Sequence, residues 1–222
     1  MSRTGKVFKQ RSRQVSGRFG AIDVLVNNAG FGLFGLFESA SREKIQEQFD
    51  VNVFGVMDVT RAILPHFRKN KRGLVINVSS AGGIITLPLM SLYISTKFAI
   101  EGFSESLAYE LSSQNIVVKL VEPGGVSTDF HKRSGEEYAQ SVTVQGYEGF
   151  VAHTNKIFDQ MRAAPLSTPE EIAEVIFEAA TDGTSRLRYQ IIKDIRPFVD
   201  AKREMSERDY EEFMRARFLP RS

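Results

Sequence analysis

Tyr93 and Lys97 have the residue types and the spacing for proton transfer at an alcohol or carbonyl oxygen. They lie four residues apart within a pattern that predicts a helix, so their side chains share one helix face. An ammonium group beside a phenol favours the phenolate, and we therefore expect Lys97 to lower the pKa of Tyr93 towards neutrality. A tyrosine tuned in this way can exchange a proton with an alcohol or a carbonyl. The pair by itself is a weak signal, because most such pairs are only neighbours on a helix surface.

Two segments elsewhere in the chain could complete a site around this pair. Ser79 and Ser80 follow one apolar run, and Pro123-Gly124 follows another. A serine hydroxyl can donate a hydrogen bond to a reacting oxygen and stabilise the charge that develops there. No side chain can supply a hydride, so interconversion of a carbonyl and an alcohol at this site would need a nicotinamide.

Short apolar runs alternate with long helical patterns along the chain. We predict strands at Val24–Asn27, Leu74–Val78, Val117–Val121 and Leu187–Ile192. We predict helices at 42–70, at 93–111, from Thr168 to about Gly183, and from Ser206 to about Phe218. Continuous apolar strands separated by helices are typical of a doubly wound α/β fold, in which a parallel sheet is covered on both faces. Ligands bind such a sheet outside the carboxyl ends of its strands, so we expect the segments named above to face one crevice.

The chain of 222 residues fits a single α/β domain. Residues 1–20 would hold a remnant helix at 4–18, and residues 21–129 would form the catalytic core. Residues 167–222 would form a helix, a strand and a final helix. The segment between them, 130–166, is polar and has an irregular pattern, and we interpret it as a lid over the substrate.

The composition argues against several classes of protein. The 29 basic and 27 acidic residues nearly cancel, which disfavours a protein dedicated to nucleic acid or to a membrane surface. There is no cysteine, and the histidines (His66, His131 and His153) lack metal-ligand spacing, so we expect no metal site. No apolar run approaches the roughly 20 residues that cross a bilayer, and the first residues lack the apolar stretch of a signal peptide. We therefore expect a cytoplasmic protein.

The order of these features resembles the short-chain dehydrogenase/reductase family from about Phe19 to Ile192. The matching motifs are Asn27-Asn28-Ala29-Gly30, Asn52 in Asp50-Val51-Asn52-Val53, Ser80 thirteen residues before Tyr93, Tyr93 and Lys97 as YxxxK, and Pro123-Gly124 with Val126 and Thr128. The resemblance implies a Rossmann-like fold. It also implies an NAD(P)-dependent oxidoreductase that interconverts an alcohol and a carbonyl compound.

The resemblance further implies a role for each matching residue. Tyr93 would be the general acid/base, Lys97 would lower its pKa and hold the nicotinamide ribose, and Ser80 would orient the substrate oxygen. Asn52 would hold a water in a proton relay to Lys97. Val126 and Thr128 would contact the nicotinamide carboxamide. The whole set expected to bind the cofactor, NAD or NADP, is Asn27, Ala29, Gly30, Tyr93, Lys97, Pro123, Gly124, Val126 and Thr128.

The chain departs from the family pattern at its front. Family members begin with a strand and a glycine-rich TGxxxGxG turn that holds the cofactor pyrophosphate. Thr4-Gly5 matches the first two letters, but Lys9 and Arg11 occupy the positions of the next glycines. We therefore expect a truncated relative whose sheet lacks the first strands and this turn, and whose choice between NAD and NADP cannot be read. The strand at 24–27 would have an open edge, so we expect the isolated chain to be marginally stable or to associate through that edge.

Three interpretations of function follow from these observations. The first is the oxidoreductase, for which apolar residues at 31–37 and at Leu87, Leu89 and Met90 favour an apolar alcohol or ketone as substrate. The second is a catalytically inactive, truncated relative that acts as an interaction module, because loss of the pyrophosphate turn would remove much of the cofactor affinity. The third, a nucleic-acid-binding protein with a basic N-terminus, has little support. The resemblance also raises the expectation of a homo-oligomer.

Overall fold

The computed structural model describes residues 7, 8, 10, 14, 15, 17, 18, 20–128, 130, 134 and 144–220. Most of the expected remnant helix at 4–18, with Thr4, Gly5, Lys9 and Arg11, lies outside these residues. Much of the expected lid, from 131 to 143 apart from Ser134, lies outside them as well.

Four parallel strands form the sheet in the order β1-β2-β3-β4. Their bounds are β1 Val24–Asn27, β2 Gly73–Val78, β3 Ile116–Pro123 and β4 Arg188–Ile191. The two central strands are buried on both faces, which is why their sequences read as continuous apolar runs. The predicted strands are confirmed, and β3 continues beyond its predicted end because Glu122 and Pro123 pair with β4.

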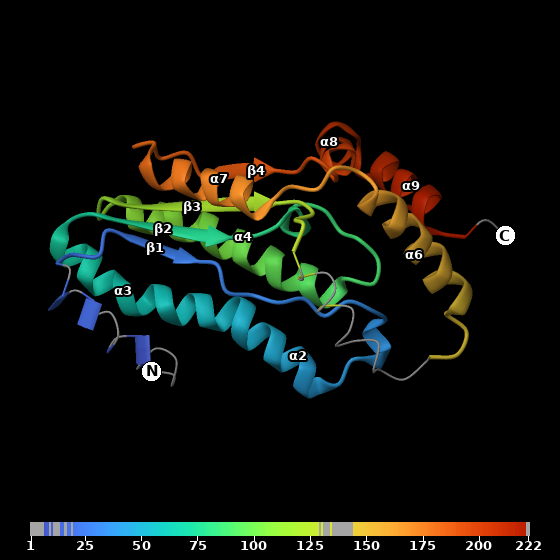
Figure 1. Cartoon of the computed structure of the whole chain (residues 1–222), viewed down its shortest axis with the longest axis horizontal. Coiled ribbons are helices and arrows are strands. Elements are labelled where there is room, and N and C mark those ends of the chain that lie inside the picture. Colours follow the sequence, from blue (N-terminus) through green and yellow to red (C-terminus); the bar gives the residue numbers. More distant parts are fainter. Residues whose placement is uncertain are drawn as a thin grey trace.

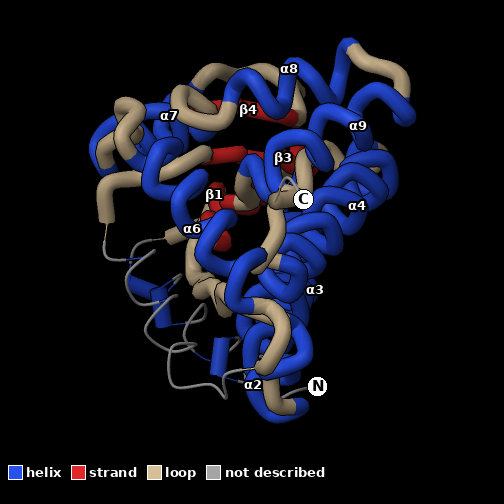
Figure 2. The backbone as a smooth tube through the Cα atoms, turned by 90° about the vertical axis from the view of Figure 1, so that its right-hand side faces the viewer, coloured by secondary structure: helices blue, strands red, loops and turns tan. Residues whose placement is uncertain are grey.

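Helices connect the strands and cover the sheet (Figure 1). Their bounds are α2 Arg42–Phe49, α3 Val56–Asn70, α4 Ser91–Ser112, α6 Glu148–Arg162, α7 Pro169–Thr181, α8 Arg196–Glu204 and α9 Glu207–Phe218. The long helices α3 and α4 pack on one face of the sheet, and α7 packs on the other (Figure 2). The chain therefore has the expected α/β fold, with a parallel sheet between two helical layers.

A separate apolar core lies beyond the carboxyl ends of the strands. It joins α6, α8 and α9 through Ile157, Phe198, Val199 and Phe218. The strand arrows in Figure 1 point towards these three helices. This part of the chain therefore stands next to the edge of the sheet where a site is expected.

The helix predicted at 42–70 is interrupted. After α2, residues Asp50–Gly55 form a π-helical turn, η2, and α3 begins at Val56. Such turns often occur at functional sites, because the extra residue re-aims nearby side chains. Asn52, a predicted site residue, lies within this turn.

The irregular pattern predicted for 130–166 is wrong between Glu148 and Arg162, where the chain forms α6. Thr154, Ile157 and Met161 face the interior at helical spacing, but the many polar residues between them hid that period. The helix α8 was also not predicted. It is short, and Pro197 in its first turn reads in the sequence as the end of an element, although proline is common at the start of a helix.

The first strand, β1, pairs only with β2 among the described residues. Val24 and Val26 are 37% and 40% exposed, as expected for an edge strand that is incompletely covered. Association through this edge stays a prediction. Among the residues that the structure describes, none of the helices has the length and apolar character of a membrane span.

Candidate active site

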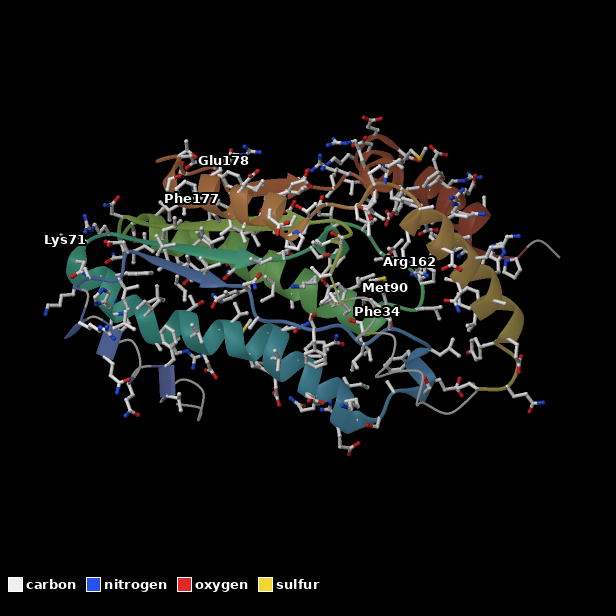
Figure 3. All side chains as sticks on the ribbon, in the orientation of Figure 1. Phe34, Lys71, Met90, Arg162, Phe177 and Glu178 are labelled. Carbon is white, nitrogen blue, oxygen red and sulfur yellow. The ribbon has the colours of Figure 1, made fainter. Side chains whose placement is uncertain are left out.

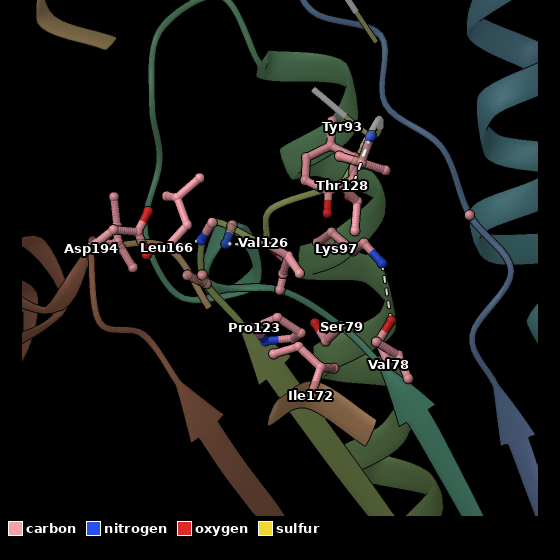
Figure 4. A pocket seen from close by; sticks show the side chains of 18 of the residues that line it. Val78, Ser79, Tyr93, Lys97, Pro123, Val126, Thr128, Leu166, Ile172 and Asp194 are labelled. Atoms are coloured by element: carbon pink, nitrogen blue, oxygen red, sulfur yellow. Dashed lines mark hydrogen bonds between the residues drawn. The ribbon is translucent and has the colours of Figure 1, made fainter. Parts of the chain in front are cut away.

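A cavity of about 700 Å³ lies at the carboxyl ends of the strands (Figure 4). Its polar wall comes from the ends of β2 and β3 and from the first turns of α4. The predicted site residues that line it are Gly30, Ser80, Tyr93, Lys97, Pro123, Gly124, Val126 and Thr128. The crevice expected from the strand ends is therefore present, and it gathers segments that are far apart in the sequence.

Tyr93 and Lys97 lie in the first turns of α4, and both side chains are buried. The Lys97 Nζ lies 5.5 Å from the centroid of the Tyr93 ring. It also donates a hydrogen bond to the carbonyl oxygen of Val78 at 3.0 Å (Figure 4). This bond fastens α4 to the end of β2 and holds the lysine beside the tyrosine.

Burial shifts the pKa of both groups. It raises the pKa of Tyr93 to about 12, against a smaller lowering by a hydrogen bond with Ser80. It lowers the pKa of Lys97 to about 8, against a smaller raising by the Glu101 carboxylate. The direction at Tyr93 is opposite to the one expected, because burial penalises the phenolate more than the polar neighbours stabilise it. Tyr93 in this structure is therefore a phenol, which is the form that donates a proton.

Ser80 caps η3, the short 3-10 turn Ala81–Gly83 that follows β2. Its Oγ accepts a hydrogen bond from the backbone N–H of Gly82 at 3.1 Å, which leaves the hydroxyl proton for another acceptor. A Cβ on Gly82 would lie 3.5 Å from both the Ser80 Oγ and a ring carbon of Tyr93. The serine and the tyrosine therefore border the same point of the cavity wall.

Asn52 lies behind the cavity. Its Nδ2 donates to the carbonyl oxygen of Phe31 at 2.8 Å and to the Thr96 Oγ1 at 3.0 Å, and its Oδ1 accepts from the N–H of Phe31 at 3.1 Å. The side chain thus joins the loop after β1 to α4. A Cβ on Gly30 would lie 3.2 Å from the Asn52 Oδ1 and 4.0 Å from the Lys97 Nζ, so Gly30 borders both polar groups.

Two residues of the predicted cofactor set, Asn27 and Ala29, are not among those that line the cavity. The Asn27 amide donates instead to the Thr60 Oγ1 at 3.1 Å and to the Asn77 Oδ1 at 2.8 Å. It therefore links β1 to α3 and β2. Asn28, the next residue, lines the cavity.

Aromatic rings surround Tyr93 on its apolar side. The ring centroids of Phe34 and Phe130 each lie 5.6 Å from the ring centroid of Tyr93, and they lie 6.1 Å from each other. Phe34 belongs to the apolar run that we expected at the mouth of the crevice. Phe130 was expected only as the start of the lid, because nothing in its neighbours marks it as a contact of the tyrosine.

The helix α6 supplies lining residues that the sequence analysis missed. Phe158, Met161 and Arg162 line the same cavity as Phe34 and Met90. Figure 3 shows Arg162 near Met90 and Phe34, beyond the ends of the strands. Their spacing of three and four residues is a helical signal, and recognising α6 would have been the way to find them.

The polar wall fits the nicotinamide half of NAD or NADP. Gly30 lacks a side chain beside Asn52 and Lys97, where a ring and a ribose would need close approach to the backbone. Lys97 offers a buried ammonium that donates one hydrogen to the Val78 carbonyl oxygen and has two more for ribose hydroxyls.

Comparison with known proteins points in the same direction. The family model for short chain dehydrogenase matches residues 3–139. An uncharacterized oxidoreductase of Schizosaccharomyces pombe is 40% identical over 185 residues, which cover 82% of this chain and 75% of the yeast protein. Retinol dehydrogenase 8 of Bos taurus is 34% identical over 192 residues, which cover 82% of this chain and 60% of the bovine protein.

Solved structures agree with the sequence comparison. A short-chain dehydrogenase from Streptomyces avermitilis superposes on this chain with a TM-score of 0.76 at 29% identity. The match covers 97% of this chain and 77% of the other. The similarity of fold therefore extends well beyond the segment that the family model matches.

Proposed function

The chain belongs to the short-chain dehydrogenase family, and on that premise we propose that it is an NAD(P)-dependent oxidoreductase that interconverts an alcohol and a carbonyl compound. The observation that carries the proposal is the convergence of Ser80, Tyr93 and Lys97 on one cavity. A phenol, a hydroxyl and an ammonium group in one buried wall suit proton transfer at a carbonyl oxygen.

Tyr93 and Ser80 act on the same substrate oxygen. In reduction, Tyr93 donates its phenolic proton to the carbonyl oxygen, which becomes the hydroxyl of the alcohol. Ser80 donates a hydrogen bond to that oxygen and stabilises the negative charge that builds up there. A hydride, which a reduced nicotinamide supplies when bound, completes the reduction at the carbonyl carbon. In oxidation, the alcohol proton moves to the Tyr93 phenolate, and the hydride would leave the alcohol carbon for an oxidised nicotinamide.

Lys97 stabilises the phenolate that Tyr93 becomes when it gives up its proton. Its Nζ is 5.5 Å from the tyrosine ring in a buried setting, where opposite charges attract more strongly than in water. The same ammonium group would hold the ribose hydroxyls of a bound cofactor. Asn52 fixes the loop at Gly30 beside Lys97, and a water held by the Asn52 Oδ1 would relay the proton to Lys97.

The substrate that best fits the remaining wall is an apolar alcohol or ketone. Phe34, Leu87, Met90, Phe130 and Phe158 provide this wall, and Phe34 and Phe130 contact the Tyr93 ring. One relative is named for retinol, which is an apolar alcohol. We assign the lid role to 130–166, of which Phe130, α6 and Leu166 line the cavity.

A binding titration of NADH and NADPH on the purified chain, followed by fluorescence, tests the proposal. We expect a micromolar Kd for at least one nucleotide and turnover with apolar ketones. Tyr93→Phe should keep nucleotide binding while its turnover falls by about 10²-fold or more, because the phenyl ring cannot transfer a proton.

Tyr109→Phe is the matched control, since Tyr109 lies on the same helix and is 72% exposed. It should leave binding and turnover unchanged. A folded wild-type chain that binds neither nucleotide up to millimolar concentration would refute the proposal. That result would favour the inactive relative that acts as an interaction module.

A further inference from the structure

Asp194 lines the cavity, although no motif in the sequence pointed to it. It lies in the short connection between β4 and α8, and Figure 4 shows it beside the loop that follows β3. Its Oδ1 accepts a hydrogen bond from the backbone N–H of Gly125 at 2.9 Å. The carboxylate of one segment therefore holds the backbone of another that is far away in sequence.

The two glycines of this loop owe their identity to the carboxylate. A Cβ on Gly124 would lie 2.4 Å from the Asp194 Oδ1, and a Cβ on Gly125 would lie 2.6 Å from the Oδ2. Real Cβ atoms do not approach oxygens so closely, so any side chain at either position would push Asp194 away. The sequence Gly124-Gly125 and the carboxylate of Asp194 thus form one fitted unit.

Backbone hydrogen bonds hold the same loop on its other sides. The N–H of Gly124 donates to the carbonyl oxygen of Ile191 at 2.7 Å, and the carbonyl oxygen of Gly125 accepts from the N–H of Ser167 at 3.0 Å. The N–H of Ser127 donates to the carbonyl oxygen of Ser167 at 2.9 Å. The Asp194 carboxylate adds one more acceptor to these backbone hydrogen bonds. Hydrogen bonds to charged groups are stronger than those between neutral groups.

We propose that Asp194 is a positioning residue for the nicotinamide end of the cofactor. By holding the N–H of Gly125 and filling the space beside Gly124, it fixes the backbone from which Val126 and Thr128 face the cavity. The inference rests on the proposed function, because it requires that a nicotinamide binds against this loop. Asp194 does not contact the reacting atoms in this proposal, and it acts only through the loop.

The test compares three substitutions by fluorescence titration with NADH and NADPH. Asp194→Ala removes the acceptor and should raise the Kd of the preferred nucleotide about tenfold or more. Asp194→Asn keeps a side-chain oxygen at the same place and should restore the Kd to within about threefold of wild type. Asp23→Ala removes the aspartate of an exposed ion pair with Arg72 and should leave the Kd unchanged.

Two measurements separate positioning from a general loss of structure. Thermal unfolding should give Asp194→Ala a single cooperative transition with a Tm only a few degrees below that of Asp194→Asn, because one hydrogen bond is lost, while hydrogen exchange at the Gly125 amide becomes faster only in the alanine variant. If Asp194→Ala does not fold, Gly124→Ala takes its place. That substitution displaces the carboxylate without removing it and should weaken nucleotide binding in the same way.

The outcomes distinguish this inference from the proposed function. A wild-type chain that binds nucleotide, with an Asp194→Ala variant that binds it equally well, would overturn the inference alone. Equal weakening in Asp194→Ala and Asp194→Asn would also overturn it, because the loop contact survives in the second variant. A folded wild-type chain that binds no nucleotide would overturn both, and the Gly125 amide exchange would then report only on the structure of the loop.

Discussion

Lys97 is placed where a lysine ammonium is costly. The residue is 8% exposed, and burial lowers its pKa from 10.5 to about 8. Below that pH the folded chain holds a desolvated cation, and its partners are the carbonyl oxygen of Val78 and the more distant Glu101 carboxylate. The charge therefore lowers the free energy of unfolding, and we attribute its presence to the role proposed for it beside Tyr93.

Lys97→Met should make the chain more stable and less active. At pH 7 we expect the free energy of unfolding to rise by about 1–3 kcal/mol, because the cost of burying the ammonium disappears. The unfolded wild type binds more protons than the folded wild type between the folded pKa of about 8 and the ordinary lysine pKa of 10.5. Wild-type stability therefore increases with pH across this window, and the advantage of the variant should vanish there.

Urea unfolding at several pH values measures the effect, and turnover should fall by about 10²-fold or more. Lys44→Met, which removes an exposed ion pair with Glu47, should change stability by less than about 0.5 kcal/mol. A Lys97→Met variant that is less stable than wild type at pH 7 would contradict the argument. It would mean that the bond to Val78 outweighs the cost of burial.

Residue types and spacing were sufficient to predict that Ser80, Tyr93 and Lys97 share a cavity, but not that Asn27 and Ala29 lie outside its lining. Ser80, Tyr93 and Lys97 lie at strand ends or helix starts that are visible as local patterns. The pKa direction at Tyr93 was not predictable, because burial depends on Phe34 and Phe130 from distant segments. The same holds for Asp194, whose partner at Gly125 comes from another strand end.

The helix α7 shows how local signals determine an element. Thr168 and Glu171 form a capping box, in which the Thr168 Oγ1 accepts from the Glu171 N–H at 3.2 Å and the Glu171 carboxylate accepts from the Thr168 N–H at 3.0 Å. Pro169 occupies the first turn, where its missing N–H costs nothing. Each of these signals lies within four residues, so the start of the helix could be predicted.

Other elements depend on contacts that no local pattern contains. The π-helical turn η2 is held through Asn52, which bonds to Phe31 and to Thr96 on α4. The helix α6 buries Thr154 and Ile157 against the C-terminal helices, and the apolar face was too narrow to recognise among polar residues. The π-helical turn is therefore a tertiary feature without a local pattern, whereas α6 has a helical period that its polar residues obscure.

Thr168→Ala should destabilise the chain through the start of α7. Loss of the cap leaves the Glu171 N–H without its side-chain acceptor and should lower the free energy of unfolding by about 1 kcal/mol. Because Ile172 and Ile176 on this helix line the cavity, nucleotide binding should weaken slightly as well. Urea unfolding followed by circular dichroism measures the change.

Thr181→Ala tests the other end of the same helix. The Thr181 Oγ1 only returns a hydrogen bond to the carbonyl oxygen of Phe177, so its loss should cost less than about 0.5 kcal/mol. If both substitutions lowered the free energy of unfolding equally, the capping hydrogen bond of Thr168 would have no special part in the stability of α7.

Over the whole molecule, buried charges join elements that the sequence separates widely. The Arg188 Nε on β4 lies 3.2 Å from a Glu101 carboxylate oxygen on α4 and 3.1 Å from one of Glu122 on β3. A second nitrogen of the same guanidinium lies 2.5 Å from the Glu105 carboxylate, which is half-exposed. Gln190 on β4 donates to the Glu122 carboxylate at 2.6 Å. One helix and two strands thus meet at this cluster, and no motif predicted it because its members lie in three different elements.

The Glu122 carboxyl group holds its proton to a higher pH than a free glutamate does. Burial, and next the neighbouring Glu101 carboxylate, raise the pKa of Glu122 from 4.5 to about 7. Between these two values the folded chain binds more protons than the unfolded chain. The contribution of this group to stability is therefore complete below about pH 4.5 and is lost as the pH rises through 7.

Glu122→Gln should remove that pH dependence, because an amide of the same shape has no proton to lose and still accepts from Gln190. We expect the variant to match wild type near pH 5 and to exceed its free energy of unfolding by about 2 kcal/mol at pH 8. Urea unfolding across this range measures the difference.

Glu212→Gln on α9, which breaks an exposed pair with Arg208, should follow the wild-type curve. A Glu122→Gln curve that keeps the wild-type slope would show that Glu122 is ionised throughout, and that Arg188 stabilises both buried carboxylates as anions.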